Sequence, residues 1–245
     1  MNPIRICIIV PANTDQYNQA IKNAVSVVLP PDVTVDVTNI SKGNNCIQNR
    51  VNLLQNGFPV VELARQIDAA LDPATGLKKY QGIWLSDFDM CGVEATREVI
   101  NIPIIGGFSA CAYTALTLCR KFSIVTILQS TVEMQRDHIA AFNLTNSFAS
   151  IHSIDVPVDE LKNTKLVVEK TYQAAVKAIT EEGAQSILLG CTGFTNVAAD
   201  VSTMLEETLG LYIPVIDPNQ AGISMLISLI RMNLRPSRVT YPQFC

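Results

Sequence analysis

Short apolar runs alternate with longer segments of helical periodicity along the whole chain. The apolar runs have the length of buried strands, and the segments between them are long enough to form helices that cover a sheet. Alternation of this kind is typical of parallel α/β layers. The predicted strands are residues 4–10, 34–37, 82–85, 102–105, 122–127, 150–154, 186–189 and 213–216, and the predicted helices are residues 15–29, 59–71, 91–100, 108–119, 131–142, 161–181, 195–209 and 220–232.

The succession of strands and helices occurs twice. Residues 83–87 are followed by a helix, a strand beginning Ile-Pro and a second helix, and the same succession follows residues 187–191. The strand, polar turn and helix that begin at residue 6 are likewise repeated from residue 123. The repeat predicts two pseudo-symmetric Rossmann-like lobes whose parallel sheets face a central cleft. We expect the first lobe to span residues 1–110 and the second 111–216, with the C-terminal segment 217–245 packed back on the first.

Charge and composition limit the classes of partner. The chain has a net charge of −4 and no cluster of Lys and Arg, which argues against nucleic acids and anionic membranes. The apolar start at 4–10 is too short for the core of a signal peptide. The run at 221–230 contains Gly and Ser and is shorter than the roughly 20 residues of a membrane span. We therefore expect a cytoplasmic protein whose partner is a small molecule.

The cysteines and histidines form neither a disulfide framework nor a metal-ligand pattern. The seven cysteines include no Cys-x-x-Cys pair, and neither His138 nor His152 has ligand spacing around it. We therefore expect no metal. Apart from Cys91 and Cys191, the cysteines are expected to be core thiols at Cys7, Cys111 and Cys119, or thiols without a role in a loop and at the terminus, Cys46 and Cys245.

Cys191 is the strongest candidate for chemistry. It follows the apolar run 186–189 within Leu189-Gly190-Cys191-Thr192-Gly193, which predicts a tight turn from a strand into a helix. A thiol on such a turn is expected to be exposed and electrostatically activated. Open α/β sheets bind their ligands beyond the carboxyl ends of the strands. The other side chains expected there are Asn13, Thr14, Ser86, Asp87, Phe88, Thr126, Thr192 and Gly193.

Some of these residues also have structural interpretations. Asn13 and Thr14 are typical helix caps, and because the free amides of a helix start bind carboxylates, a capping role and a binding role are compatible. Thr192 and Gly193 have the same double interpretation. Phe88 is expected to form an apolar wall beside the substrate.

Other predictions concern caps and loops. Asp89 and Asp217 are expected to cap helices, and Gly57-Phe58-Pro59 is expected to start one. The polar segment 42–49 is interpreted either as a loop over the cleft or as a solvated connection.

Several short motifs occur in a specific order. Val10-Pro11-Ala12-Asn13-Thr14 lies near the start, and Gly92-Val93-Glu94-Ala95-Thr96-Arg97-Glu98 precedes Ile102-Pro103-Ile104-Ile105-Gly106. The strand at 122–126 and the turn around Cys191, followed by Pro214-Val215-Ile216-Asp217, complete the set. In this order the chain resembles the aspartate/glutamate/hydantoin racemase superfamily, in its hydantoin/allantoin racemase-like branch, over nearly its whole length.

The resemblance implies a two-lobed, cofactor-independent enzyme that forms a homo-oligomer. In racemases of this family, two cysteines, one from each lobe, face each other across the substrate. One thiolate removes the α-proton, and the opposite thiol returns a proton to the other face. Cys191 matches the second cysteine. The first falls on Asp87, in agreement with the internal repeat, and the nearest cysteine is Cys91, four residues later.

Three hypotheses for the partner of Cys191 stay open. In the first, Cys91 lies in the first turn of a helix capped by Asp89 and acts as the second acid or base. In the second, Asp87 is the partner, which requires burial to raise its pKa because an ordinary aspartate is a weak base toward carbon. In the third, Cys191 alone delivers the proton.

The predicted function is that of an isomerase of the racemase class. It would racemise or epimerise a carbon α to a carboxylate or a hydantoin-type carbonyl, while Asn13, Thr14, Thr192 and Gly193 hold the substrate oxygens and stabilise enolate charge. A one-cysteine decarboxylase or cis-trans isomerase of the same superfamily is the alternative. A two-lobed small-molecule-binding protein without turnover is a further one.

Overall fold

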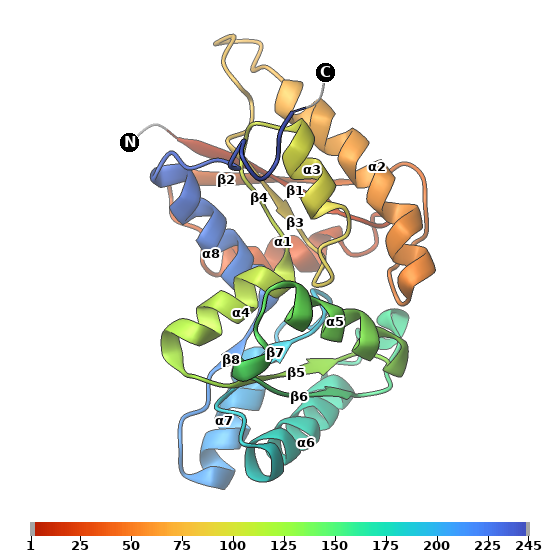
Figure 1. The fold of residues 1–245 in the computed structure, drawn as a ribbon, viewed down its shortest axis with the longest axis vertical. Coiled ribbons are helices and arrows are strands. Elements are labelled where there is room, and N and C mark those ends of the chain that lie inside the picture. Colours follow the sequence, from red (N-terminus) through yellow and green to blue (C-terminus); the bar gives the residue numbers. More distant parts are fainter. Residues whose placement is uncertain (1–2, 244–245) are drawn as a thin grey trace.

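Two parallel four-stranded sheets form the framework of the computed structural model, which describes residues 3–243 (Figure 1). The strand order is β2-β1-β3-β4 in the first sheet and β6-β5-β7-β8 in the second, and every pairing is parallel. The predicted fold class is therefore confirmed. The strands are β1 Ile4–Val10, β2 Val33–Asn39, β3 Gly82–Leu85, β4 Ile104–Ile105, β5 Phe122–Thr126, β6 Phe148–Ser153, β7 Ser186–Leu189 and β8 Val215–Ile216.

Helices connect consecutive strands in both halves of the chain. Each lobe thus repeats the same order of elements, as the internal repeat predicts. The helices are α1 Asn18–Ser26, α2 Arg50–Ala69, α3 Val93–Val99, α4 Gly107–Leu118, α5 Gln129–Ala141, α6 Thr164–Glu182, α7 Ala198–Leu209 and α8 Pro218–Arg231, with short 3₁₀ turns η1 Thr145–Ser147 and η2 Val158–Glu160.

The two lobes use the same device at their shortest strands. In β4 and β8, the residue before the paired segment is a proline, and its carbonyl accepts a hydrogen bond from the neighbouring strand. Ile83 donates to Pro103 in the first lobe, and Ile187 donates to Pro214 in the second, each at 2.9 Å. Proline has no N–H to contribute to a ladder. Strands β4 and β8 are therefore shorter than the predicted runs.

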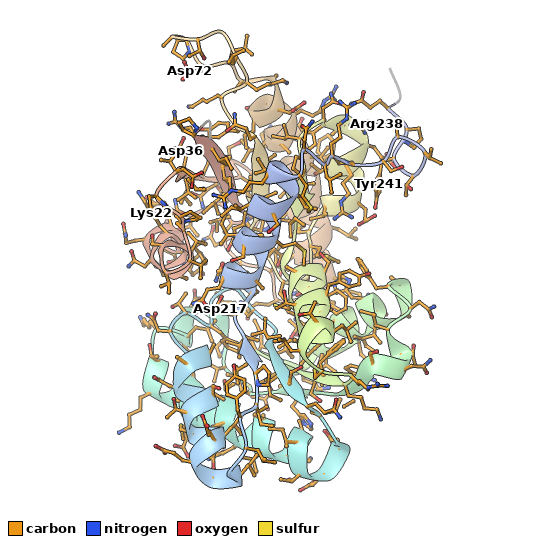
Figure 2. All side chains as sticks on the ribbon, turned by 90° about the vertical axis from the view of Figure 1, so that its left-hand side faces the viewer. Lys22, Asp36, Asp72, Asp217, Arg238 and Tyr241 are labelled. Atoms are coloured by element: carbon orange, nitrogen blue, oxygen red, sulfur yellow. The ribbon has the colours of Figure 1, made fainter. Side chains whose placement is uncertain are left out.

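The last helix, α8, lies against the first lobe although it follows β8 of the second. It contacts β3, β4, α1 and α4, while α4 also contacts β5, β7 and β8 (Figures 1 and 2). The Asp217 side chain caps α8 by accepting hydrogen bonds from the backbone N–H groups of Asn219 and Gln220, as predicted. Helices α4 and α8 therefore join the two sheets.

The start of α2 differs from the prediction. The helix begins at Arg50, where the Asn49 side chain accepts a hydrogen bond from the Asn52 backbone N–H. Pro59 lies inside the helix and does not start it. The Gly-Phe-Pro sequence suggested a later start because the true cap, Asn49, lies ten residues before Pro59. Among residues 3–243, no helix is both long and apolar enough to cross a membrane.

The core thiols follow the prediction in part. Cys7 and Cys111 are buried, whereas Cys119 is half-buried, with its thiol 3.1 Å from the Ser186 hydroxyl. Cys245 lies outside the described residues.

The packing of α8 on β3 leaves no room for a side chain at Gly222. A Cβ atom there would lie 2.0 Å from Cζ3 of the Trp84 ring, which is fully buried. We expect Gly222→Ala to lower the free energy of unfolding by about 1–3 kcal/mol, because the overpacked ring has to shift. Urea unfolding measures the change. Ser224→Ala, at an exposed position of the same helix, is the control and should stay within about 0.5 kcal/mol of the parent.

Candidate active site

The turns that follow β3 and β7 meet at the boundary between the lobes. The Thr192 hydroxyl donates to the backbone carbonyl of Ser86 at 3.1 Å, and both residues are buried. Asn219, at the start of α8, completes the contact. Its side-chain amide donates to the Thr192 carbonyl at 2.8 Å, and its carbonyl oxygen accepts from the Ser86 hydroxyl at 3.2 Å. These three hydrogen bonds bring the predicted site residues of both lobes together.

Asn219 was not identified from the sequence. It is fully buried at the second position of α8, where an asparagine is usually an exposed or capping residue. The only sequence signal was its place directly after Asp217-Pro218, at the end of the second repeat.

Asp87 is buried in the turn after β3. Its Oδ2 accepts a hydrogen bond from the backbone N–H of Cys91 at 2.7 Å. Burial and the neighbouring carboxylate of Asp89 raise the pKa of Asp87 to about 7, and this rise is opposed by backbone hydrogen bonds and by attraction to His138. The carboxyl group therefore titrates near neutral pH, where a general base is most effective.

Cys191 occupies the equivalent place in the second lobe. Asp87 and Cys191 each lie two residues beyond the end of a central strand, β3 or β7. Cys191 keeps some solvent exposure, but the surrounding protein raises the pKa of its thiol to about 12. The hydrogen bond from the Gly193 N–H, 3.3 Å long, opposes this rise, whereas the charges of Asp87 and Asp89 add to it.

The expectation of an activated thiol on a turn directly into a helix is therefore wrong. Helix α7 begins only at Ala198, seven residues after Cys191, so no helix start lies beside the sulfur. The turn before α1 is longer than predicted in the same way. At neutral pH the thiol of the unliganded protein is a proton donor.

Cys91 faces away from this arrangement. Its residue is buried, and its thiol donates to the backbone carbonyl of Leu53 in α2 at 3.2 Å. Burial, with the charges of Asp87 and Asp89, raises its pKa well above the ordinary value. The predicted helical environment is also absent, because α3 begins at Val93, with Gly92 and not Asp89 at the cap position.

The segment between β2 and α2 spans the two lobes. On one side, the Asn44 carbonyl accepts from the backbone N–H of Asn13 at 3.0 Å, and on the other the Gln48 carbonyl accepts from the Ser130 hydroxyl at 2.7 Å. Cys46 lies between these anchors and is one of the neighbours that raise the pKa of Cys191. The interpretation of residues 42–49 as a loop over the site is the one that these contacts favour. Cys46, given no role from the sequence, is therefore a neighbour of the site.

The other predicted binding residues divide into two groups. Asn13 is exposed and Thr14 partly exposed, so both can reach a ligand near the end of β1. Ser86 and Thr192 form the hydrogen bonds between the turns, and the Gly193 amide donates a hydrogen bond to the Cys191 sulfur.

Phe88 and Thr126 lie in the interior. The Phe88 ring packs edge-on against Phe108, with 5.9 Å between ring centroids, and is 1% exposed. The Thr126 hydroxyl bonds the Thr131 hydroxyl at 2.8 Å within the second lobe, and the residue is fully buried. Neither side chain is placed to contact a substrate.

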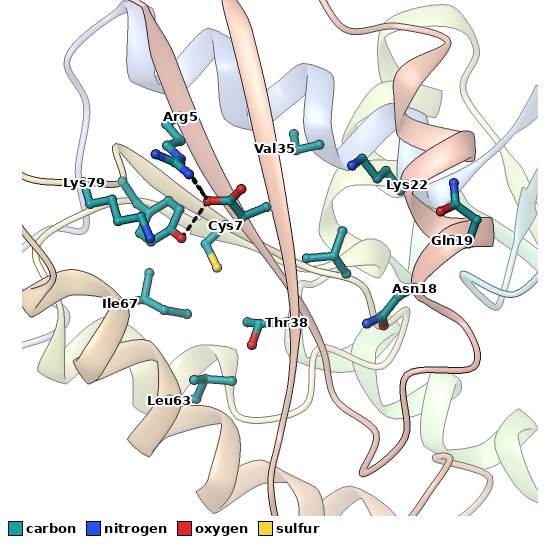
Figure 3. Close-up of a pocket in the computed structure, with 13 residues that line it drawn as sticks. Arg5, Cys7, Asn18, Gln19, Lys22, Val35, Thr38, Leu63, Ile67 and Lys79 are labelled. Carbon is teal, nitrogen blue, oxygen red and sulfur yellow. Dashed lines mark hydrogen bonds and ion pairs between the residues drawn. The ribbon is translucent and has the colours of Figure 1, made fainter. Parts of the chain in front are cut away.

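A separate groove of about 610 Å³ runs along β2, the edge strand of the first sheet (Figure 3). Within it, Asp36 accepts hydrogen bonds from Arg5 and Tyr80, each at 2.8 Å. Burial alone would raise the pKa of Asp36, but these bonds lower it below the ordinary value. The groove is lined from the first lobe alone and by none of the predicted site residues, so it is not the candidate active site.

No group of three or more His, Cys, Asp or Glu within residues 3–243 is arranged to hold a metal ion. At the boundary between the lobes, a carboxyl group and a thiol occupy equivalent positions.

The fold is a two-lobed α/β scaffold that brings one proton-transfer group from each lobe to a shared boundary. Comparisons with known proteins identify the family. The family model described as Asp/Glu/Hydantoin racemase matches residues 6–226. The chain therefore belongs to the Asp/Glu/hydantoin racemase family. This confirms the predicted family and, at the level of family, the predicted racemase class of isomerase.

Individual relatives agree with this placement. The chain is 32% identical to an uncharacterized protein of Schizosaccharomyces pombe, over 96% of this chain and 95% of that protein. It is 25% identical to a hydantoin racemase of Paenarthrobacter aurescens, over 96% and 94% of the two chains. Among solved structures, an allantoin racemase from Klebsiella pneumoniae superposes with a TM-score of 0.87 and 25% identity, over 99% of this chain and 95% of that one.

The buried contact between the turns should have a measurable energy. Because Asn219→Ala leaves the Thr192 carbonyl and the Ser86 hydroxyl without their partner, we expect it to lower the free energy of unfolding by about 1–3 kcal/mol. Combining it with Ser86→Ala in a double-mutant cycle should give a coupling of at least about 0.5 kcal/mol.

Asn23→Ala, at an exposed position of α1, is the matched control and should change the free energy of unfolding by less than about 0.5 kcal/mol. A cost for Asn219→Ala no larger than that of the control would contradict the role given to this contact.

Proposed function

We propose that the protein is a cofactor-independent racemase or epimerase in which Asp87 and Cys191 are the two acid/base groups. The observation that carries the proposal is their equivalence. Each lies two residues beyond a central strand of its own lobe, in turns that hydrogen-bond to each other. A pair of proton-transfer groups from opposite lobes is what exchange at the two faces of one carbon requires.

The protonation of the two groups supports fixed roles in the resting enzyme. With a pKa of about 7, Asp87 is substantially ionised at neutral pH, whereas Cys191, with a pKa of about 12, is protonated. Asp87 would remove the α-proton, and the Cys191 thiol would donate a proton to the opposite face. Cys91 is less suited, because its thiol is bonded to α2.

The substrate oxygens would be held by Asn13 and Thr14 near the end of β1. Thr192 and Gly193 would join them by exchanging their hydrogen bonds to Ser86 and to the Cys191 sulfur for bonds to the substrate. These groups are uncharged donors, so they suit a neutral hydantoin-type ring or a monocarboxylate better than a dicarboxylate. The relatives described as hydantoin and allantoin racemases support the same substrate class. Donors aimed at a carbonyl oxygen would stabilise the enolate that forms when the α-proton leaves.

Location and assembly are also part of the proposal. On the resemblance to the family, we propose a cytoplasmic homo-oligomer that acts on a small molecule without a metal or cofactor.

A one-sided reaction that uses Cys191 alone is the second candidate. It is favoured by one observation, that a carboxyl group and not a second thiol occupies the equivalent position in the first lobe. In a decarboxylase or cis-trans isomerase of this kind, Asp87→Asn would keep activity.

The first prediction of the two-sided mechanism concerns proton exchange. Cys191→Ala and Asp87→Asn should each reduce incorporation of solvent deuterium at the α-carbon by at least about 100-fold, because each removes a general acid or base. The measurement is NMR of hydantoins, allantoin and amino acids incubated in deuterated water. Cys91→Ala, which removes the thiol bonded to Leu53, is the matched control and should keep exchange within a few-fold. Undiminished exchange in Cys191→Ala would refute the proposal. Full activity in Asp87→Asn would contradict the two-sided mechanism and support the one-sided alternative.

The second prediction concerns pH. Because Asp87 must be ionised to act as a base, kcat/KM should fall tenfold per pH unit below about pH 7 and level off above it. Asp87→Cys restores a thiol at this position and should move this limb to higher pH, since an ordinary thiol titrates at about 8.5. If kcat/KM of Asp87→Cys falls below the same pH as that of the parent, another group controls the pH dependence.

A further inference from the structure

A buried polar cluster joins Asp89, beside the proposed base, to helix α5 of the opposite lobe. Its members are Asp89, Gln135 and His138, and the mechanism proposed above does not use any of them. Within the described residues, each carries a buried polar atom without a hydrogen-bond partner: Asp89 Oδ1, Gln135 Oε1 and His138 Nε2. Such atoms are rare in folded proteins, and three in one place point to a function beyond packing.

The geometry of the cluster is specific. His138 Nε2 lies 3.5 Å from Asp89 Oδ1, a distance that allows charge attraction although the two atoms form no hydrogen bond. Gln135, one turn before His138 on the same face of α5, donates to Asp89 Oδ2 at 3.3 Å and to the Gly190 carbonyl at 2.8 Å. Gln135 therefore connects Asp89 to the residue that precedes Cys191.

The position of the His138 ring is fixed by packing. It lies against Phe108 with 5.0 Å between ring centroids, and its side chain is 16% exposed. The Asp89 side chain is 7% exposed. The imidazole thus sits at the edge of the cluster, with one face on an aromatic ring and one nitrogen toward the carboxylate.

Few elements supply the titratable groups near Asp87. The turn after β3 supplies the Asp89 carboxylate and the Cys91 thiol, α5 supplies His138, and the turn after β7 supplies the Cys191 thiol. The loop between β2 and α2 adds the Cys46 thiol, a neighbour of Cys191. His138 is the one group in this set that carries a positive charge when protonated. Two buried carboxyl groups two residues apart cannot both ionise cheaply without such a cation.

We propose that His138 is a positioning residue for Asp87 that acts through Asp89 across the boundary between the lobes. His138 Nε2 lies 3.5 Å from the Asp89 carboxylate, and a positive charge on the imidazole favours the ionised form of Asp87. A negative charge on Asp89 disfavours ionisation of Asp87. The two side chains therefore act on the proposed base in opposite directions, as their effects on the pKa of Asp87 also indicate.

The arrangement couples catalysis to the contact between the lobes. Asp87 and Asp89 belong to the first lobe, whereas His138 and Gln135 belong to α5 of the second. The contact between the lobes therefore supplies both the burial that raises the pKa of Asp87 and the imidazole that lowers it. The importance of His138 for catalysis rests on the proposed function of Asp87. The effect of His138 and Asp89 on the ionisation of Asp87 does not.

The experiment is an NMR titration of the unliganded protein labelled with ¹³C at the aspartate carboxyl groups, with Asp87→Asn used to assign the Asp87 signal. Relative to the parent, His138→Gln should move the Asp87 midpoint to higher pH, and Asp89→Asn should move it to lower pH, each by about half a pH unit or more. His152→Gln is the matched control. His152 pairs with Glu182 inside the second lobe, 2.7 Å apart, and its loss should leave the Asp87 midpoint unchanged.

Opposite displacements support the inference, because a merely structural effect would not change sign between the two variants. Unchanged midpoints, or displacement in the same direction in both, overturn it. If His138→Gln does not fold, the near-isosteric Asp89→Asn decides alone: a midpoint that falls supports the inference and one that stays or rises overturns it.

Deuterium exchange at the substrate carbon separates this inference from the proposed function. If the midpoints move as expected while Cys191→Ala retains exchange, the electrostatic relation stands and the proposed function fails. If the midpoints do not move while exchange depends on both Asp87 and Cys191, the proposed function stands and the inference fails.

Discussion

The buried hydrogen bonds among Ser86, Thr192 and Asn219 are the constraint on which the rest of the site depends. They join two turns that lie 106 residues apart in the sequence, and each bond involves a group that would be costly to bury alone. Asn219 belongs to α8, which leaves the second lobe and packs on the first. The position of the last helix therefore also fixes the distance between the two turns. The same bonds hold the turns that carry Asp87 and Cys191 against each other.

Closing the two turns also determines the electrostatics of the site. Removing water raises the pKa of a carboxyl group and of a thiol alike, since burial disfavours the charged form of both. The hydrogen bonds that oppose this rise are few: backbone N–H groups for Asp87 and the Gly193 amide for Cys191. The same contact that assembles the site therefore keeps the thiol protonated and brings the carboxyl group into the neutral range.

The sequence was most informative where local and tertiary preferences agree. The bounds of β1, β3 and β7 coincide with the predicted runs, because each is a mostly apolar, largely buried segment that is ended by a turn. The start of α2 was wrong because the cap at Asn49 acts further upstream than the Gly-Phe-Pro signal.

Features that depend on contacts across the boundary could not be predicted. The expected activation of Cys191 assumed an adjacent helix start, but eight residues, 190–197, separate β7 from α7. The burial of Asn219 and the approach of His138 to Asp89 join residues 133 and 49 positions from their partners in the chain. No local pattern carries such information, since the partner is set only when the lobes pack together.

The duplicated scaffold fixes where the two reacting groups stand but leaves their chemistry free. Burial raises both pKa values by a similar amount, from 3.8 to about 7 for Asp87 and from 9.0 to about 12 for Cys191. It therefore does not remove the difference in proton affinity between a carboxyl group and a thiol. Under the proposed two-base mechanism, one enantiomer would meet an ionised Asp87 in the resting enzyme, whereas the other would require a protonated Asp87 and a Cys191 thiolate. Because two enantiomers are equally stable, the kcat/KM values for the two directions of racemisation have a fixed ratio. That ratio does not determine the populations of the two protonation states of Asp87 and Cys191. The difference in proton affinity is reduced only by groups that raise the pKa of Asp87 or lower that of Cys191, as the Asp89 carboxylate does at the first position and the Gly193 amide at the second. His138 acts in the opposite direction, because it lowers the pKa of Asp87.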